Sequence, residues 1–231
     1  MKFHLLLLLA FLVSCYDKEP KPVGNNFAQT PDLSVKIKPV EKDSVVTKTR
    51  LYKDLSYTNN YKLTYTTHYK NTWPEHCYRS IEVFNKRGKR TDSIGLEIMA
   101  FMSYGEDIND TRSYITNKNN SKQMVNNNAG DFVVADLNFD GREDFSVVNN
   151  TGADVGPYSV FYVQNAEGKF KRDVFLSDSV QFFPNEIYPK NRILVTYIHA
   201  GVCGVGQHKY KLNKANHWHQ ISHIYRNICD D

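Results

Sequence analysis

Short stretches in which apolar and polar residues alternate recur from about residue 45 to the C-terminus. This period of two predicts strands with one buried face, because successive side chains of a strand point to opposite sides of the sheet. Turn-forming residues separate several of these stretches, and residues 165–168 predict a hairpin. The predicted strands are 61–68, 79–85, 131–135, 145–148, 158–164, 169–176, 192–199, 207–212 and 217–225. The pattern indicates an all-β domain built from antiparallel sheets.

Two further stretches are less regular. Residues 94–102 are apolar enough for a buried strand or a short helix, and their periodicity favours neither. Residues 117–128 are rich in asparagine and predict a loop. No stretch has the apolar spacing of a well-defined amphipathic helix, so the sequence leaves room for one short helix in an otherwise all-β domain.

The first 14 residues have the composition of a signal peptide. Lys2 precedes an apolar run that is too short to span a membrane as a helix. Leu12-Val13-Ser14-Cys15 resembles the lipobox of bacterial lipoproteins, in which the cysteine is lipidated and becomes the first mature residue. The resemblance implies acyl chains such as palmitate on Cys15, and an outer-membrane protein facing the periplasm or the cell surface. An ordinary signal peptide with a coincidental cysteine is the alternative.

Residues 15–44 are expected to form the lipidated N-terminus and a flexible linker. They carry Pro20, Pro22, Pro31 and Pro39 among charged and polar residues, and such a stretch buries too little apolar surface to offset its ordering entropy. Residues 45–231 then form a single β-rich domain.

Charge and cysteine usage bear on the class of partner and on the disulfide pairing. The net charge is +4 and the basic residues are scattered, so nothing indicates a nucleic-acid partner. With Cys15 lipidated, three cysteines remain in an oxidising compartment. A final hairpin that turns near residues 213–216 would bring Cys203 and Cys229 together at its open end, which predicts a disulfide and leaves Cys77 unpaired.

The stretch Asp136-Leu137-Asn138-Phe139-Asp140-Gly141-Arg142-Glu143-Asp144 predicts a calcium loop. Oxygen side chains occupy positions 1, 3, 5 and 9, and the glycine at position 6 permits the turn that brings in the main-chain carbonyl of residue 142. The expected ligands are Asp136, Asn138, Asp140, Arg142 through its carbonyl, and Asp144. Val147 replaces the closing glutamate of an EF-hand, and predicted strands rather than helices flank the loop. A solvated acidic turn is the alternative.

The strand–DxNxDGxxD–strand arrangement resembles the calcium loops of FG-GAP and VCBS-type repeats. With the order of features that follows it, through the segments 158–164 and 168–177, the chain resembles single-blade FG-GAP-like proteins of the bacterial envelope. That group includes periplasmic inhibitors of invertebrate-type lysozyme and immunity proteins against secreted peptidoglycan hydrolases. The resemblance covers roughly residues 79–225 and implies a sheet domain like one β-propeller blade.

The inhibitors of that group insert a Ser-Gly-x-x-Tyr-type loop into the lysozyme cleft. The nearest counterpart here has longer spacing and comprises Thr151, Gly152, Asp154, Gly156 and Tyr158. A rigid loop tipped by tyrosine offers apolar area and a hydroxyl at low entropic cost. The alternative is that the two glycines only turn the chain and that Tyr158 packs in the core.

Other constellations favour structural roles. His217, His219 and His223 share one strand face, with His208 across from them, but surface histidines explain them better than a zinc site. The glycine-rich residues 201–206 lack the order of a phosphate loop. Glu143 beside the loop aspartates is a poor glycosidase pair if calcium occupies those oxygens.

The sequence therefore predicts a calcium-binding envelope lipoprotein that is not an enzyme. We expect it to inhibit a lysozyme-type peptidoglycan hydrolase by inserting a loop into its cleft, with calcium holding the strand junction beneath residues 149–158. The alternative is a calcium-stabilised surface module, such as an adhesin or glycan-binding protein, without inhibitory activity. No nucleophile–base pair and no cofactor motif supports catalysis.

Overall fold

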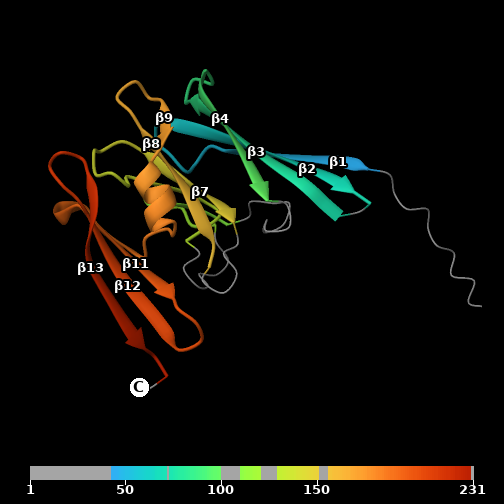
Figure 1. Ribbon diagram of the computed structural model, residues 1–231. Helices are drawn as coiled ribbons and strands as arrows, with labels where there is room; N and C mark the ends of the chain where they lie inside the picture. Colours follow the sequence, from blue (N-terminus) through green and yellow to red (C-terminus); the bar gives the residue numbers. More distant parts are fainter. Residues whose placement is uncertain (1–42, 72, 100–109, 121–128, 151–155, 230–231) are drawn as a thin grey trace, which may run out of the picture. The chain divides into compact units, whose positions relative to one another are not determined.

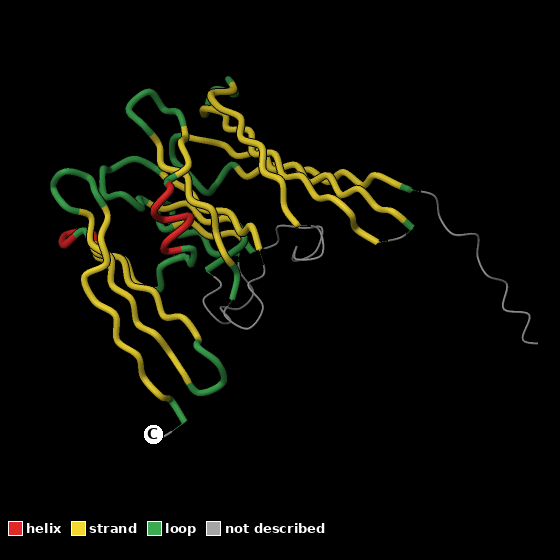
Figure 2. The backbone as a smooth tube through the Cα atoms, in the orientation of Figure 1, coloured by secondary structure: helices red, strands yellow, loops and turns green. Residues whose placement is uncertain are grey.

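The computed structural model describes residues 43–229, except for residue 72 and the segments 100–109, 121–128 and 151–155. Several predicted features therefore lie outside the described residues. They are the signal peptide, the lipidation site Cys15, most of the linker, and most of the loop 151–158 that is expected to contact a partner, called the partner loop below. Within the described part, the regular secondary structure is almost entirely strands, which confirms the all-β prediction (Figures 1 and 2). No helix of this part is long and apolar enough to cross a bilayer.

The first sheet has four antiparallel strands in chain order. They are β1 (Ser44–Tyr52), β2 (Asn59–Lys70), β3 (Trp73–Asn85) and β4 (Arg90–Met99). The sequence pattern did not predict β1, in which few side chains are buried. It left residues 94–102 undecided, and the structure places those up to Met99 in a strand.

The second sheet has five strands. It contains the predicted calcium loop, residues 136–144, which is called the metal loop below. They are β5 (Thr111–Ser113), β6 (Phe132–Ala135), β7 (Asp144–Asn150), β8 (Tyr158–Gln164) and β9 (Phe170–Arg172). β5 pairs with β6 in parallel and the other pairs are antiparallel. The predicted turn joins β8 to β9, where the Asn165 N–H donates to the Lys169 carbonyl at 2.8 Å.

The third sheet comprises the last four strands. They are β10 (Glu186–Tyr188), β11 (Ile193–His199), β12 (Gly204–Leu212) and β13 (Trp218–Asn227). A 3-10 turn, η4 (Pro189–Asn191), lies between β10 and β11.

One helical segment replaces part of a predicted strand. The prediction of a strand over residues 169–176 is wrong after Arg172, because a short helix that contains η3 (Leu176–Val180) follows. The Asp173 carboxylate accepts the N–H of Leu176 at 2.8 Å and so caps the first turn. Leu176 and Val180 are buried, and this packing holds the segment in a helical form.

The second sheet contributes to two apolar cores, one on each of its faces. Phe132, Phe145 and Val147 share one cluster with Tyr61 and Ile81 of the first sheet. On the other face, residues of β6 and β8 cluster with the helical segment and with the third sheet; the cluster includes Val133, Ala135, Phe161, Leu176, Leu194 and Tyr210. Because all four residues of β6 are buried, its sequence is continuously apolar rather than alternating.

A buried arginine links the first and second sheets. The Arg79 side chain on β3 donates to the Val148 carbonyl on β7, and its guanidinium carbon lies 5.0 Å from the centroid of the Tyr65 ring. A buried charge is costly unless polar or aromatic groups surround it. Arg79 therefore anchors the end of β7 from which the 151–155 segment departs.

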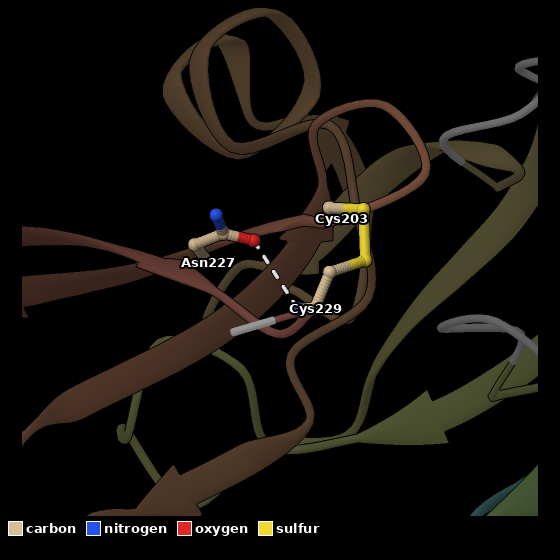
Figure 3. The surroundings of a disulfide bond; sticks show 3 residues. All are labelled: Cys203, Asn227 and Cys229. Atoms are coloured by element: carbon tan, nitrogen blue, oxygen red, sulfur yellow. Dashed lines mark hydrogen bonds between the residues drawn. A yellow bond between two sulfur atoms is a disulfide. The ribbon is translucent and has the colours of Figure 1, made fainter. Parts of the chain in front are cut away.

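A disulfide joins Cys203 to Cys229, with their Cα atoms 5.1 Å apart (Figure 3). This is the pair expected from the hairpin geometry. The bond lies at the open end of β12–β13, where the Asn227 side chain accepts the N–H of Cys229 at 3.1 Å. Cys77, by contrast, is a buried free thiol.

We expect Cys203→Ser/Cys229→Ser to lower the free energy of unfolding by roughly 3–4 kcal/mol, because the disulfide closes a loop of 26 residues and limits the unfolded chain. Denaturant unfolding measures the difference. Reductant should shift the parent by the same amount and leave the double variant unchanged. A parent that is insensitive to reductant would contradict the stabilising role.

Candidate metal centre

The predicted metal loop connects β6 to β7 as a hairpin. Ala135 pairs with Asp144 across its base, so the intervening eight residues form the connection. Phe139 has φ 61° and Gly141 has φ 82°. Both therefore lie in the left-handed region, and Gly141 occupies it without the steric cost that a side chain would add.

The side chains at loop positions 1, 3 and 5 accept hydrogen bonds from the backbone of the loop itself. The Asp136 carboxylate accepts the N–H of Asp140 at 3.1 Å and the N–H of Gly141 at 3.0 Å. Asn138 Oδ1 also accepts the N–H of Asp140 at 3.1 Å, and Asp140 Oδ1 accepts the N–H of Arg142 at 2.9 Å. The oxygens of Asp136 and Asn138 thus converge on the same backbone amide.

Asp144, at loop position 9, is fully buried and joins the loop to the neighbouring strand. One carboxylate oxygen accepts the N–H groups of Leu137 at 2.9 Å and Asn138 at 3.2 Å. The other accepts the N–H of Gln164, at the end of β8, at 2.8 Å. A single side chain therefore fixes both the start of the loop and its position against β8.

Burial changes the acidity of the loop carboxyls. Desolvation raises the pKa of Asp144 to about 7, although three backbone hydrogen bonds act in the opposite direction. Desolvation also raises the pKa of Asp136, and the nearby Asp140 charge adds to this. Desolvation therefore disfavours the ionised form of both carboxyls, unless a nearby cation compensates their negative charge.

Arg142 supplies one such cation from within the loop. Its guanidinium forms an ion pair with Asp140, and its Nε donates to the Gln164 carbonyl at 2.9 Å. Asn138 Nδ2 also donates to Asp140, at 2.8 Å. Across the described ranges, no group of three or more His, Cys, Asp and Glu side chains is placed to hold a metal ion.

The loop residues fit a hard divalent cation in donor type and in order. The side-chain donors at positions 1, 3, 5 and 9 are all carboxylate or amide oxygens, which calcium prefers. Asp136, Asn138, Asp140 and Asp144 would hold the ion together with the carbonyl of residue 142. The Arg142 side chain, which faces Asp140, is the feature of this arrangement that sequence reasoning did not anticipate.

Glu143 is a structural residue that the sequence analysis missed. Its buried carboxylate accepts the Tyr57 N–H at 2.9 Å and the Thr58 hydroxyl at 2.6 Å, and it also accepts from Ser56 and Asn59. Three of these donors belong to the β1–β2 connection, and Asn59 is the first residue of β2. The sequence held no signal for this contact, because the partners are 84 to 87 positions away.

The expected partner loop lies mostly outside the described residues. Thr151, Gly152 and Asp154 belong to that part of the chain, whereas Gly156 is buried with φ 96°. Tyr158 begins β8 opposite Asn150. Its ring is half-buried against Phe182, with the ring centroids 5.0 Å apart.

The expectation that calcium holds the strand junction beneath residues 149–158 rests in part on residues 151–155, which lie outside the described residues. β7 begins at Asp144, beside the loop, and ends at Asn150, from which the partner segment departs. Six strand steps of about 3.3 Å place these two points roughly 20 Å apart. The β7–β8 hairpin connects the metal loop to the described residues on either side of the segment 151–155.

A cavity of about 330 Å³ adjoins the metal loop. Apolar surface from Trp218, Val163 and Leu212 lines it together with polar side chains, which include Asn138, Asp140, Arg142, Gln164, Lys171 and Asn216. Phe139 of the loop lies against Trp218 with ring centroids 6.0 Å apart. The loop thus contacts the last strand as well as β8.

The histidines do not gather at one point. His208 and His223 face each other across β12 and β13, and their rings stack with centroids 4.3 Å apart. Burial and the proximity of His223 lower the pKa of His208. His219 pairs instead with Lys211 farther along the hairpin, and His217 precedes β13.

Comparisons with known proteins give one distant likeness. No family model matches the chain, and no curated protein matches it. A solved structure described as a Xanthomonas type IV secretion system related protein is 17% identical with a TM-score of 0.47, and the match covers 80% of this chain and 90% of that chain. At this identity and TM-score, the likeness supports no statement about activity, ligand or partner.

We expect Glu143→Gln to lower the free energy of unfolding by about 1.5–3 kcal/mol, because a buried charged acceptor would be replaced by an amide that turns an N–H toward donors. Thermal or denaturant unfolding measures the loss. Glu167→Gln, an exposed glutamate in the β8–β9 turn, is the matched control. Equal stability of the two variants would show that the Glu143 contacts contribute little.

Proposed function

We propose that this chain is a bacterial envelope lipoprotein that binds calcium through residues 136–144 and blocks a lysozyme-type peptidoglycan hydrolase. The observation that carries the proposal is the β7–β8 hairpin, which has the metal loop at one end and the segment 151–157 at the other. The sequence resemblance to envelope hydrolase inhibitors supports the target class. The protein would act as a plug and would perform no chemistry.

Burial of the hairpin supports a rigid connection between its two ends. Phe145 and Val147 of β7 and Phe161 of β8 are almost completely buried. Asp144 ties the start of β7 to the last residue of β8 through the Gln164 N–H. A hairpin that is packed on both faces presents its far end with little loss of conformational entropy on binding.

In this proposal, the metal-loop carboxylates bind the ion and fix the strand register, and Tyr158 contacts the partner. Calcium, when bound, would supply the positive charge that offsets the desolvated carboxyls of Asp136 and Asp144. Asp144 holds the strand register through its backbone hydrogen bonds. At the other end, Tyr158 is held against Phe182, so its orientation is fixed by packing before any partner arrives.

A second candidate function is a calcium-stabilised module that binds glycans, as an adhesin or accessory lipoprotein. The cavity of about 330 Å³ beside the metal loop favours it, because an indole surrounded by amide and carboxylate groups suits a sugar ring and its hydroxyls. Binding of peptidoglycan fragments without any effect on lysozymes would distinguish this module from an inhibitor.

We expect calcium to raise the melting temperature of the parent and to have little effect on Asp136→Ala or Asp144→Ala. Both variants remove a carboxylate from the proposed coordination set. Asp178→Ala removes an exposed carboxylate from η3 and should respond to calcium as the parent does. A full calcium response in either loop variant would contradict the metal assignment.

We expect the protein to inhibit one of the chicken, goose or invertebrate types of lysozyme, with inhibition weakened by chelator and by Tyr158→Ala. Tyr158→Phe keeps the packing on Phe182 and isolates the contribution of the hydroxyl. Tyr57→Ala changes an exposed tyrosine of the β1–β2 connection and should have no effect.

The inhibition constants of the parent and of the variants are measured with each lysozyme type in turbidity assays. Equal inhibition by Tyr158→Ala and the parent would exclude this end of the hairpin from the mechanism. Failure to inhibit any lysozyme type, with the calcium response intact, would favour the glycan-binding module.

A further inference from the structure

A basic pocket lies on the first sheet, far along the sequence from the metal loop. It has a volume of about 630 Å³. Its lining combines four basic residues with two apolar ones and no acidic one: Leu51, Lys53, Asn60, Lys62, Phe84, Lys86, Arg87 and Gly88. All of these residues belong to β1–β3 or to the connections beside them, so one sheet forms the whole pocket.

Strand register explains why these residues meet. Leu51 pairs with Lys62, and Asn60 pairs with Phe84, so their side chains emerge on one face of the sheet. This face is opposite the one that carries the buried Tyr61 and Leu63. The β3–β4 turn then adds Lys86 and Arg87 at the end of the same strands.

The position of one ammonium group is fixed at this pocket. Lys86 Nζ donates to the Lys53 carbonyl at 2.8 Å and to Asn60 Oδ1 at 2.9 Å. Both acceptors are neutral, so these bonds orient the charge without cancelling it. A positioned ammonium with a remaining donor is suited to an anionic ligand.

The positive charge of the pocket is largely uncompensated. Glu82, the neighbouring carboxylate, already pairs with Lys62 at 2.6 Å and with Arg90 at 3.1 Å. Hydrogen bonds from these two cations keep the pKa of Glu82 below its usual value. In the part of the chain that the structure describes, the side chains of Lys53 and Arg87 make no ion pair.

Apolar surface accompanies these charges. The Leu51 side chain is 51% exposed, and Phe84 is half-buried in the same pocket. Basic residues placed around exposed apolar side chains are typical of surfaces that lie at a lipid headgroup layer. A small soluble anion would bury no apolar surface against Leu51, whereas a lipid surface would.

We propose that this pocket docks the domain on an anionic lipid surface by binding phosphate-bearing headgroups. Lys53, Lys86 and Arg87 contact the phosphates, and Leu51 enters the boundary between headgroups and acyl chains. This contact is separate from any lipid on Cys15 and does not depend on calcium or on a hydrolase partner.

Vesicle binding tests the proposal with the full chain carrying Cys15→Ser, so that no acyl anchor contributes. The vesicles contain phosphatidylcholine alone or with 30% phosphatidylglycerol, an amount chosen to give a clearly negative surface. We expect binding to the anionic vesicles only. Lys53→Gln/Arg87→Gln should weaken it on the order of 30-fold, since each basic residue near an anionic leaflet contributes about fivefold.

The matched control is Lys190→Gln/Lys214→Gln, which removes two exposed lysines from η4 and from the β12–β13 turn. It should change binding less than twofold. The melting temperatures of both double variants should equal that of the parent, because the four substituted side chains form no ion pair with the described residues. Equal weakening by the two double variants would mean unspecific attraction to charge and would overturn the proposal.

Two measurements distinguish a lipid surface from a free phosphate as the ligand of the pocket: vesicle binding by Leu51→Ser, and binding of a soluble anion by the parent. Leu51→Ser should weaken vesicle binding several-fold at unchanged net charge. Pyrophosphate, measured by calorimetry, should bind the parent far more weakly than the vesicles do. Unchanged vesicle binding by Leu51→Ser, tight binding of pyrophosphate, or equal binding to neutral vesicles would each overturn the lipid assignment.

Discussion

Two consecutive buried carboxylates at the base of β7 join the first sheet to the second. Asp144 accepts hydrogen bonds from the metal loop and from β8, whereas Glu143 accepts them from the β1–β2 connection. A buried carboxylate is stable only when donors surround it, so each of these residues fixes the backbone around it. Together they join the first sheet, the loop and the β7–β8 hairpin at one point.

The apolar cores depend on that junction. Phe132 and Phe145 pack toward the first sheet, while Val133 and Phe161 belong to the cluster that includes the helical segment and the third sheet. A slip of one residue in β7 would exchange its two faces and turn Phe145 and Val147 away from the cluster that they share with the first sheet. The hydrogen bonds of Asp144 oppose such a slip, because they set β7 against β8 at the first residue of the strand.

Different surfaces of this framework carry different chemistry. The metal loop and the cavity beside it lie at one end of the β7–β8 hairpin, and Tyr158 lies at the other. The basic pocket belongs to the outward face of the first sheet. No residue is shared between these sites, so contact with a surface through one sheet leaves the other region available to a partner.

Several local features were predictable because they depend on neighbouring residues. Alternation predicted most strands, the residues at 165–168 predicted their turn, and the last hairpin brought Cys203 to Cys229. The helical segment after Arg172 was missed because its apolar residues suit a strand equally well. Packing against β8 and the third sheet decided its form.

The sequence by itself determined the all-β class and the order of oxygen donors in the metal loop, because strand period and turn chemistry are local properties. Only the tertiary structure decided what Glu143 binds, which end of the hairpin carries Tyr158, and how Lys53, Lys62 and Arg87 come to share one pocket. Such contacts join residues far apart along the chain, and they follow from strand pairing and core packing, which no local pattern encodes.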